Sequence, residues 1–309
     1  MMQPDTIPVM FAPGIINTGL SSRDISVSMD GNSIYFGVSD VSVTAVFETK
    51  RVKDGKWTEP VVSSFSGKPF FDLEPHLSPD GSMLFFLSNR PSANREPKNG
   101  WYYQNIWMMH KTLAGWSEPV MLDSLCNTDE YCYFPSATTD NTLYFTRSAK
   151  SGTPRIYKSK LRNGKYSEPE ILPINVPEEG LIYNAFVSPD EDFLIFCALN
   201  IDSTNRDPDY YISFNNRNGN WGRPVKFGPE INSEEDVASS AFVSRDGRYL
   251  FFSSSRKIPG KLIIDGGTTL KSIIASKAIP GNGSSAIYWV DAVIIEKLRQ
   301  KQVQKNNNK

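Results

Sequence analysis

The chain has 309 residues, of which 33 are basic and 34 acidic, and 39% are hydrophobic. This balance lacks the basic excess of a general nucleic-acid-binding protein and the acidic excess of a disordered chain. Three cysteines and two histidines exclude a disulfide framework and predict no structural zinc site. No run approaches the about 18 apolar residues of a membrane span, and the first residues lack the basic and apolar regions of a signal peptide.

The first element is a strand within residues 6–17. Its sequence, IPVMFAPGIINT, resembles EPVMLDSLCNT at residues 118–128, where the latter ends a longer unit. No such unit precedes the N-terminal copy, so we interpret it as an isolated last strand whose partners lie elsewhere in the chain.

The first complete repeat covers about residues 20–67 and consists of four predicted strands, A to D. Strands A and B flank a turn at Asp30-Gly31, strand C is AVFETKRV, and strand D follows Trp57 and contains Pro60. Aspartate bonds its own backbone and glycine accepts a positive φ, so this dipeptide favours a tight turn. A proline in strand D fits an edge strand, where a missing N–H does little harm.

Four similar units follow at about residues 68–128, 129–177, 178–232 and 233–292. Their turns contain Asp80, Asp140, Asp190 and Asp246, and the aromatic residues three positions before a proline are Trp116, Tyr166 and Trp221. We expect these aspartates to shape the turns. Because the aromatic residues recur once per unit, we expect them to pack neighbouring units together and not to bind sugar.

The last unit has strands A, B and C but no aromatic–proline segment after them. The N-terminal strand would supply its missing strand D and close a ring, which removes exposed sheet edges. Four short antiparallel strands per repeat predict an all-β, five-bladed β-propeller that forms a single domain over residues 1–300. The helical period of DAVIIEKLRQKQVQ predicts a short C-terminal helix, and we expect residues 301–309 to form a disordered tail.

Two of the A–B hairpins, LSPDGSMLFFLSNR and VSRDGRYLFFSSSR, resemble the PD40 or WD40-like repeats of TolB-type propellers. The resemblance covers all five units and implies the propeller fold. It implies a periplasmic or extracellular location if a signal was removed, and a cytoplasmic location is the alternative because no signal is visible. Proteins with such repeats include protein-binding translocation factors, peptidase propeller domains and carbohydrate-active enzymes, so the resemblance does not select a function.

The fold does predict where a ligand would bind. Strand A begins, and strand B ends, on the same face as the B–C loops, which are long in the second and fifth units. Long loops in a compact domain are often functional. The candidate ligand-binding residues on this face are Arg23, Asp24, Glu74, His76, Arg90, Tyr131, Tyr133, Arg147, Tyr183, Asn184, Asn200 and Arg256.

Two functions remain open from the sequence. A binding module would recognise a polar small molecule, a glycan, a peptide or a protein partner at the channel mouth. Alternatively, a glycoside hydrolase or polysaccharide lyase would use Asp24 and Glu74 as its carboxyl groups, with Glu130 or Asp236 as a third, or His76 as a base. Carboxylates in an open pocket would favour hydrolysis, whereas carboxylates bound by arginine would oppose it.

Several candidates also have a structural interpretation. The three arginines could bond neighbouring strand ends, His76 could be a hydrogen-bonded core residue, and Tyr102 and Tyr103 could cover the neighbouring unit. We expect a monomer that needs no cofactor or metal and does not bind nucleic acid.

Overall fold

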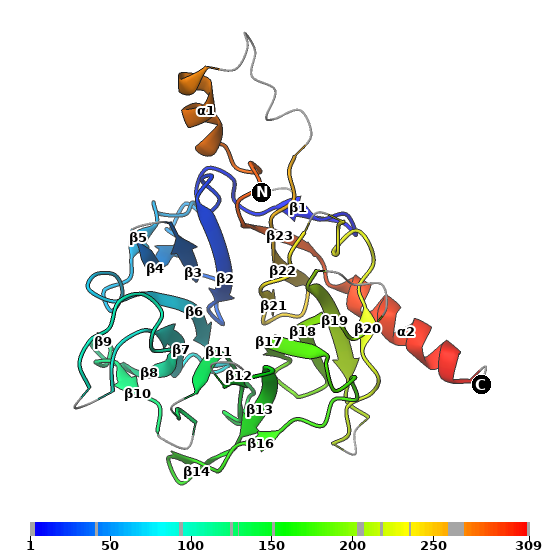
Figure 1. The fold of residues 1–309 in the computed structure, drawn as a ribbon. Helices are drawn as coiled ribbons and strands as arrows, with labels where there is room; N and C mark the ends of the chain where they lie inside the picture. Colours follow the sequence, from blue (N-terminus) through cyan, green and yellow to red (C-terminus); the bar gives the residue numbers. More distant parts are fainter. Residues whose placement is uncertain are drawn as a thin grey trace.

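The structure is a computed structural model. It describes residues 4–40, 43–92, 95–123, 126–128, 130–149, 152–202, 207–216, 219–234, 236–258 and 269–307. Five antiparallel sheets surround a central axis, and the C-terminal helix lies outside the ring (Figure 1). The prediction of an all-β, five-bladed propeller is therefore confirmed.

Each blade runs from an inner strand at the axis to a short outer strand. Blade 1 contains β2 (Ser21–Val27), β3 (Ser33–Ser39), β4 (Thr44–Lys50) and β5 (Val61–Val62). Blade 2 contains β6 (Asp72–Leu77), β7 (Met83–Ser88), β8 (Asn105–Thr112) and β10 (Val120–Met121), with β9 (Gly115–Trp116) paired to β8. Blade 3 contains β11 (Tyr131–Ala137), β12 (Leu143–Ser148), β13 (Arg155–Ser159) and β16 (Glu170–Ile171), beside a hairpin of β14 (Leu161–Arg162) and β15 (Lys165–Tyr166). Blade 4 contains β17 (Leu181–Val187), β18 (Phe193–Leu199), β19 (Asp209–Phe214) and β20 (Val225–Lys226).

Blade 5 joins the two ends of the chain, as the sequence predicts. It contains β21 (Ala241–Val243), β22 (Tyr249–Ser254), β23 (Ala286–Asp291) and, as its outer strand, β1 (Val9–Met10). The likeness between the N-terminal segment and the end of the second repeat also has a physical basis. The amide of Asn17 bonds the backbone of Ile287, and the amide of Asn127 bonds that of Ile106 in the same way. Both asparagines thereby attach the loop that follows an outer strand to the strand with which that outer strand pairs.

The A–B turns contain the aspartates in the structural role that we expected. In blade 2, Asp80 accepts hydrogen bonds from the hydroxyl of Ser78 at 2.6 Å and from the backbone N–H of Ser82 at 3.0 Å. Asn141 and Glu191 stand where the other turns have glycine, and both adopt a positive φ, of 60° and 57°. The turn geometry is therefore kept in blades 3 and 4 despite the loss of glycine.

The recurring aromatic residues pack between blades. The indole N–H of Trp116, in blade 2, donates a hydrogen bond to the hydroxyl of Tyr35 in blade 1 at 3.1 Å. Trp221, in blade 4, meets the ring of Tyr144 in blade 3 edge to face, with 6.4 Å between ring centroids. Each aromatic side chain thus contributes to the apolar layer between its own blade and the preceding one.

Two helices flank the ring. The predicted C-terminal helix is present as α2 (Val293–Asn307) and continues past residue 300, where we expected the tail to begin. A second helix, α1 (Leu270–Lys277), was not predicted; it lies within the B–C loop of blade 5, between β22 and β23, and buries none of its residues. Residues 259–268 of that long loop lie outside the described residues. Neither helix found in the described ranges is long and apolar enough to cross a bilayer.

Candidate functional site

The inner strands of four blades share a backbone irregularity. In β2, β6, β11 and β17 the pairing register shifts after the first residues, which marks a β-bulge. Asp24, Glu74, Phe134 and Asn184 occupy the equivalent bulge position, and each has a φ between 52° and 57°. Bulges re-aim side chains and are common near functional sites. Asp24 and Glu74 are the two carboxyl groups that the sequence suggested for an enzyme.

Arg23 connects these two carboxylates. Its Nε lies 2.7 Å from Oδ2 of Asp24, and its Nη2 lies 3.6 Å from Oε1 of Glu74. The other oxygen of Glu74 accepts a hydrogen bond from the backbone N–H of Phe134 at 2.7 Å. Oδ1 of Asp24 is buried and has no hydrogen-bond partner. The three side chains therefore form an ion cluster between blades 1 and 2, in which both carboxyl groups are buried and Arg23 is half-buried.

The environment of Glu74 favours its protonated form. Burial, and then the nearby charge of Asp24, raise its pKa to about 8, and Arg23 opposes this shift only in part. Burial disfavours the charged form of Arg23 as well, but Asp24 and Glu74 raise its pKa overall. A buried cluster of one guanidinium and two carboxyl groups is most stable when one carboxyl keeps its proton, because the cluster then carries no net charge.

The channel at this level is almost filled. The cavity beside Asp24 and Glu74 has a volume of about 20 Å³ and is lined by residues of all five blades. This is space for about one water molecule, whereas ligand pockets measure roughly 300–1,000 Å³. Asp24 and Glu74 thus lie in a closed site, and arginine binds both of them.

His76 has a role in the packing of the ring. Its Nε2 accepts a hydrogen bond from the backbone N–H of Ala137 in blade 3 at 2.9 Å. At the equivalent positions, the hydroxyls of Ser26 and Ser136 accept from the backbone of the next blade. Burial holds the pKa of His76 well below its usual range. The nitrogen that a catalytic base would use is therefore engaged in an inter-blade contact.

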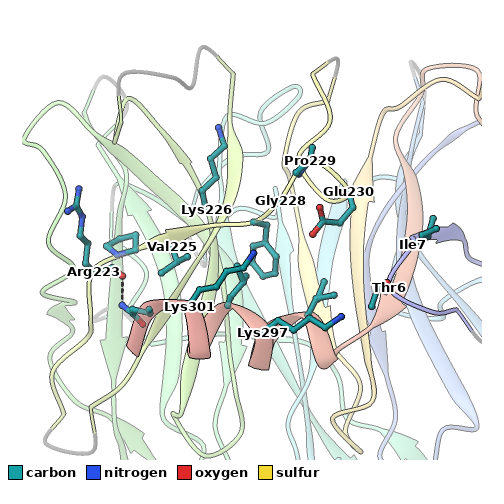
Figure 2. A pocket seen from close by; sticks show the side chains of 15 residues that line it. Thr6, Ile7, Arg223, Val225, Lys226, Gly228, Pro229, Glu230, Lys297 and Lys301 are labelled. Carbon is teal, nitrogen blue, oxygen red and sulfur yellow. Dashed lines mark hydrogen bonds between the residues drawn. The ribbon is translucent and has the colours of Figure 1, made fainter. Parts of the chain in front are cut away.

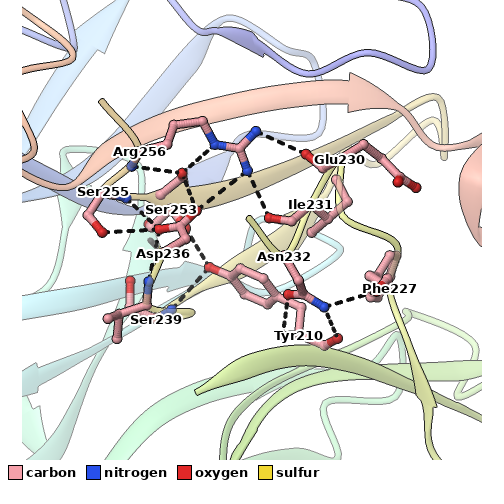
Figure 3. A network of polar contacts seen from close by, with 12 residues as sticks. Tyr210, Phe227, Glu230, Ile231, Asn232, Asp236, Ser239, Ser253, Ser255 and Arg256 are labelled. Carbon is pink, nitrogen blue, oxygen red and sulfur yellow. Dashed lines mark hydrogen bonds and ion pairs between the residues drawn. The ribbon is translucent and has the colours of Figure 1, made fainter. Parts of the chain in front are cut away.

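The three arginines at the ends of strand B also attach loops to their own blades. Arg256 donates hydrogen bonds to the carbonyl oxygens of Glu230 at 2.9 Å and Ile231 at 2.8 Å, and its Nη2 lies 3.5 Å from Asp236 (Figure 3). Its guanidinium also stacks on Tyr288, 5.0 Å from the ring centroid. The loop before β21 is thus held against the end of β22.

Arg90 and Arg147 make comparable contacts in blades 2 and 3. Arg90 pairs with Asp72 and bonds the carbonyl of Phe65. Arg147 donates to the carbonyl of Cys126 at 3.1 Å and stacks on the ring of Tyr157. Their partners are far away in sequence, so sequence alone left ligand binding and structural bonding equally open.

The remaining predicted residues are distributed over the loop face. Tyr133 and Tyr183 are half-buried, and burial raises the pKa of both phenols. The amide of Asn184 donates to the carbonyl of Ser239 at 2.6 Å, which links blades 4 and 5. Asn200 is exposed at the end of β18 and has a φ of 58°. These side chains do not line a common open pocket with Asp24 and Glu74.

An open cleft lies instead between blades 2 and 3. It has a volume of about 800 Å³ and is bounded by the long B–C loop of blade 2 and by the start of β11. Its lining includes Tyr102, Tyr103, Gln104, Asn105, Glu130 and Tyr131. Of the predicted ligand-binding set only Tyr131 lies here. The length of the B–C loop was the sequence signal that pointed to this side of the ring.

The aromatic rings of the cleft are held in place. Tyr102 and Tyr103 meet edge to face, with 5.0 Å between ring centroids, and the hydroxyl of Tyr103 donates to the carbonyl of Glu96 at 3.0 Å. Glu130 has a side chain that is 44% exposed, with Oε2 3.9 Å from Nε of Arg147. The cleft thus presents aromatic surface, the half-buried amide of Gln104 and a carboxylate, while the amide of Asn105 is buried in its wall. Within the described ranges, no three His, Cys, Asp or Glu side chains are grouped to hold a metal ion.

Solved structures with this arrangement of strands are numerous. The GH43 endo-arabinanase from Bacillus licheniformis is 11% identical, covers 90% of this chain and 95% of its own, and has a TM-score of 0.50. A protein of unknown function from Dyadobacter fermentans is 13% identical over 82% of this chain and 80% of that chain, with a TM-score of 0.50. The putative TolB from Agrobacterium tumefaciens is 14% identical over 88% and 90%, with a TM-score of 0.48. No protein-family model and no curated protein matches the sequence. At these identities, the two structures with a TM-score of 0.50 show a shared fold and leave the activity open.

Proposed function

We propose that the protein is a binding module that recognises a carbohydrate in the cleft between blades 2 and 3. The observation that carries the proposal is the contrast in volume on the loop face. The cleft provides about 800 Å³, whereas the channel beside the two carboxylates provides about 20 Å³. A saccharide of a few units fits the larger space, which lies within the usual range for ligand pockets.

The chemistry of the cleft suits a sugar. Aromatic rings offer apolar faces on which the C–H side of a pyranose stacks, while their hydroxyls bond its polar edge. Gln104 and Asn105 add amide groups that can donate and accept, and Glu130 adds an acceptor. A few polar groups around aromatic surface are typical of a site that fixes the orientation of a polar ligand.

A carbohydrate-active enzyme is less well supported. Glycoside hydrolysis needs two carboxyl groups that flank an open bond, and Arg23 pairs with both Asp24 and Glu74 in a closed site. Glu130 is the one carboxylate among the described residues that line the cleft. A single carboxylate beside tyrosines favours binding without hydrolysis.

We further propose that the repeats are of the PD40 type and that the protein works outside the cytoplasm. The two matching hairpin sequences support the first statement, and the second rests on that resemblance alone. Fractionation of the cells that naturally produce the protein, with detection by antibody, tests the second statement. We expect the protein outside the cytoplasmic fraction, and its presence in that fraction alone would contradict the proposal.

A glycan array followed by calorimetry tests the function. We expect Tyr131→Ala to weaken binding of the selected glycan by at least about tenfold, since stacking is lost. Tyr131→Phe keeps the ring and is the matched control, which should retain most of the affinity. Glu74→Gln should leave binding unchanged because that side chain lies outside the cleft.

Two results would overturn the proposal. One is that Glu74→Gln abolishes binding while Tyr131→Ala does not, which would return the site to the channel. The other is that mass spectrometry finds the glycan cleaved after long incubation, which would favour the enzyme over the binding module.

A further inference from the structure

A second open groove lies on the other side of the ring, away from the cleft. It separates helix α2 from the outer strand β20 of blade 4 and has a volume of about 1,040 Å³ (Figure 2). Its lining combines residues of α2, of the segment 223–230 around β20, and of the N-terminal residues Thr6 and Ile7. The groove shares no lining residue with the proposed sugar site.

The groove exists because α2 is held at a fixed place on the blade. Ile294, Ile295 and Leu298 are buried in the same apolar core as Phe227. At the far end of the groove, the amide of Gln302 donates to the carbonyl of Arg223 at 3.0 Å. The helix is therefore packed at its base and tied at one end, and the space between it and β20 stays open.

Positive charge borders the groove on both sides. Lys297 and Lys301 are exposed, one helical turn apart on α2, and Arg223 is exposed on the opposite side. No described carboxylate lies within ion-pairing distance of these three side chains. Lys226 stands beside them and pairs with Asp209 at 2.6 Å. Since the whole chain has a net charge of −1, this concentration of cations is local.

The floor between the cations is apolar. Pro224, Val225, Phe227, Ile294 and Leu298 contribute to it. Glu230 is the one described carboxylate in the lining, and it lies toward the Thr6 and Ile7 end (Figure 2). A polyphosphate or a sulfated sugar would satisfy the cations but would leave this apolar floor in contact with water. An acidic peptide with interspersed apolar side chains satisfies both.

We propose that this groove binds an extended acidic peptide segment of a partner protein. Acidic side chains of the peptide pair with Lys297, Lys301 and Arg223, and its apolar side chains cover Val225 and Leu298. The part of α2 that lines the groove, from Ile294 to Gln302, spans about 12 Å, a length that about four extended residues match. Cations on both banks fix the peptide along the groove.

Selection from a displayed library of short random peptides tests the proposal. The wild-type protein is the bait, and the double variant Lys297→Glu/Lys301→Glu is used for counter-selection. We expect the enriched sequences to alternate acidic with apolar residues. A selected peptide, measured by fluorescence anisotropy, should bind the double variant at least about tenfold more weakly and should bind wild type more weakly as salt is raised.

The matched control is Lys160→Glu/Lys165→Glu, which makes the same charge change on exposed residues of blade 3. It should retain the affinity within about twofold, as should Tyr131→Ala in the cleft. Equal weakening in the control would show attraction to overall charge and overturn the site. Enriched peptides without acidic residues would overturn the ligand class, as would tighter binding of heparin or of anionic lipid vesicles through the same two lysines. Failure of the sugar site would leave these outcomes unchanged.

Discussion

Replacement of Glu74 by glutamine should make the free energy of unfolding less sensitive to rising pH. In the native state, burial and the charge of Asp24 raise the pKa of Glu74 from 4.5 to about 8. In the unfolded chain this carboxyl returns to its ordinary pKa. Between these two values the native state holds a proton that the unfolded state has released. The unfolded state therefore binds fewer protons, and the free energy of unfolding falls as pH rises through this window.

The two pKa values set the size of the effect. One titrating group changes the free energy of unfolding by up to about 1.4 kcal/mol for each pH unit between them. Integrated from about pH 5 to about pH 7, a shift from 4.5 to about 8 lowers the free energy of unfolding by about 2–3 kcal/mol. Glutamine keeps the shape of the neutral acid and cannot titrate, so this component disappears in Glu74→Gln.

Urea unfolding, followed by tryptophan fluorescence over this pH range, measures the difference. The stability of Glu74→Gln relative to wild type should rise by about 2–3 kcal/mol between about pH 5 and about pH 7. The buried His76, whose pKa is lowered, makes stability rise with pH toward 6.5 in both proteins and cancels in the comparison. Glu59→Gln, at an exposed position, is the control. Parallel pH curves for wild type and Glu74→Gln would refute the reasoning, because Glu74 would then be ionised in the native state.

Deletion of residues 1–12 removes β1 and leaves β23 as an unpaired edge, so we expect a lower Tm and larger species by gel filtration; a monomer with the wild-type Tm would contradict ring closure by this strand. Arg256→Met should lower the free energy of unfolding by about 3–5 kcal/mol, because the buried Asp236 loses its cation, and denaturant titration that finds less than about 1 kcal/mol would argue for a ligand-facing arginine. His76→Ala should cost about 1–3 kcal/mol, since the backbone N–H of Ala137 loses its acceptor. Unchanged stability of His76→Ala in the same titration would contradict a structural role for this hydrogen bond.

Most of the fold could be predicted from local sequence patterns. Aspartate–glycine turns, alternating strands and the aromatic–proline segments act within a few residues, so each repeat could be identified by itself. Closure by the N-terminal strand was also predictable, because one unit lacked a strand and the other end of the chain had a spare one. The unpredicted helix α1 shows the limit, since an exposed helix with no buried face has weak hydrophobic periodicity.

The candidate site was predictable only in part. Equivalent positions in the repeats brought Asp24 and Glu74 to neighbouring places in the ring. The reach of Arg23 to both carboxylates depends on the bulged backbone, which the sequence pattern does not reveal. The partners of Arg256 are carbonyl oxygens about 25 residues away, and backbone acceptors leave no mark in a sequence.

The sequence by itself determined the number of blades, the strand order within each blade, the strand that closes the ring and the face on which inner strands begin. Only the tertiary structure decided which part of that face is open. Aligned residues from five blades meet at the axis and fill it to a space of about 20 Å³, while a long loop beside β11 leaves about 800 Å³ and α2 beside β20 leaves about 1,040 Å³. The physical reason is that repeats encode direction and register locally, whereas empty volume depends on how side chains from distant segments pack against one another.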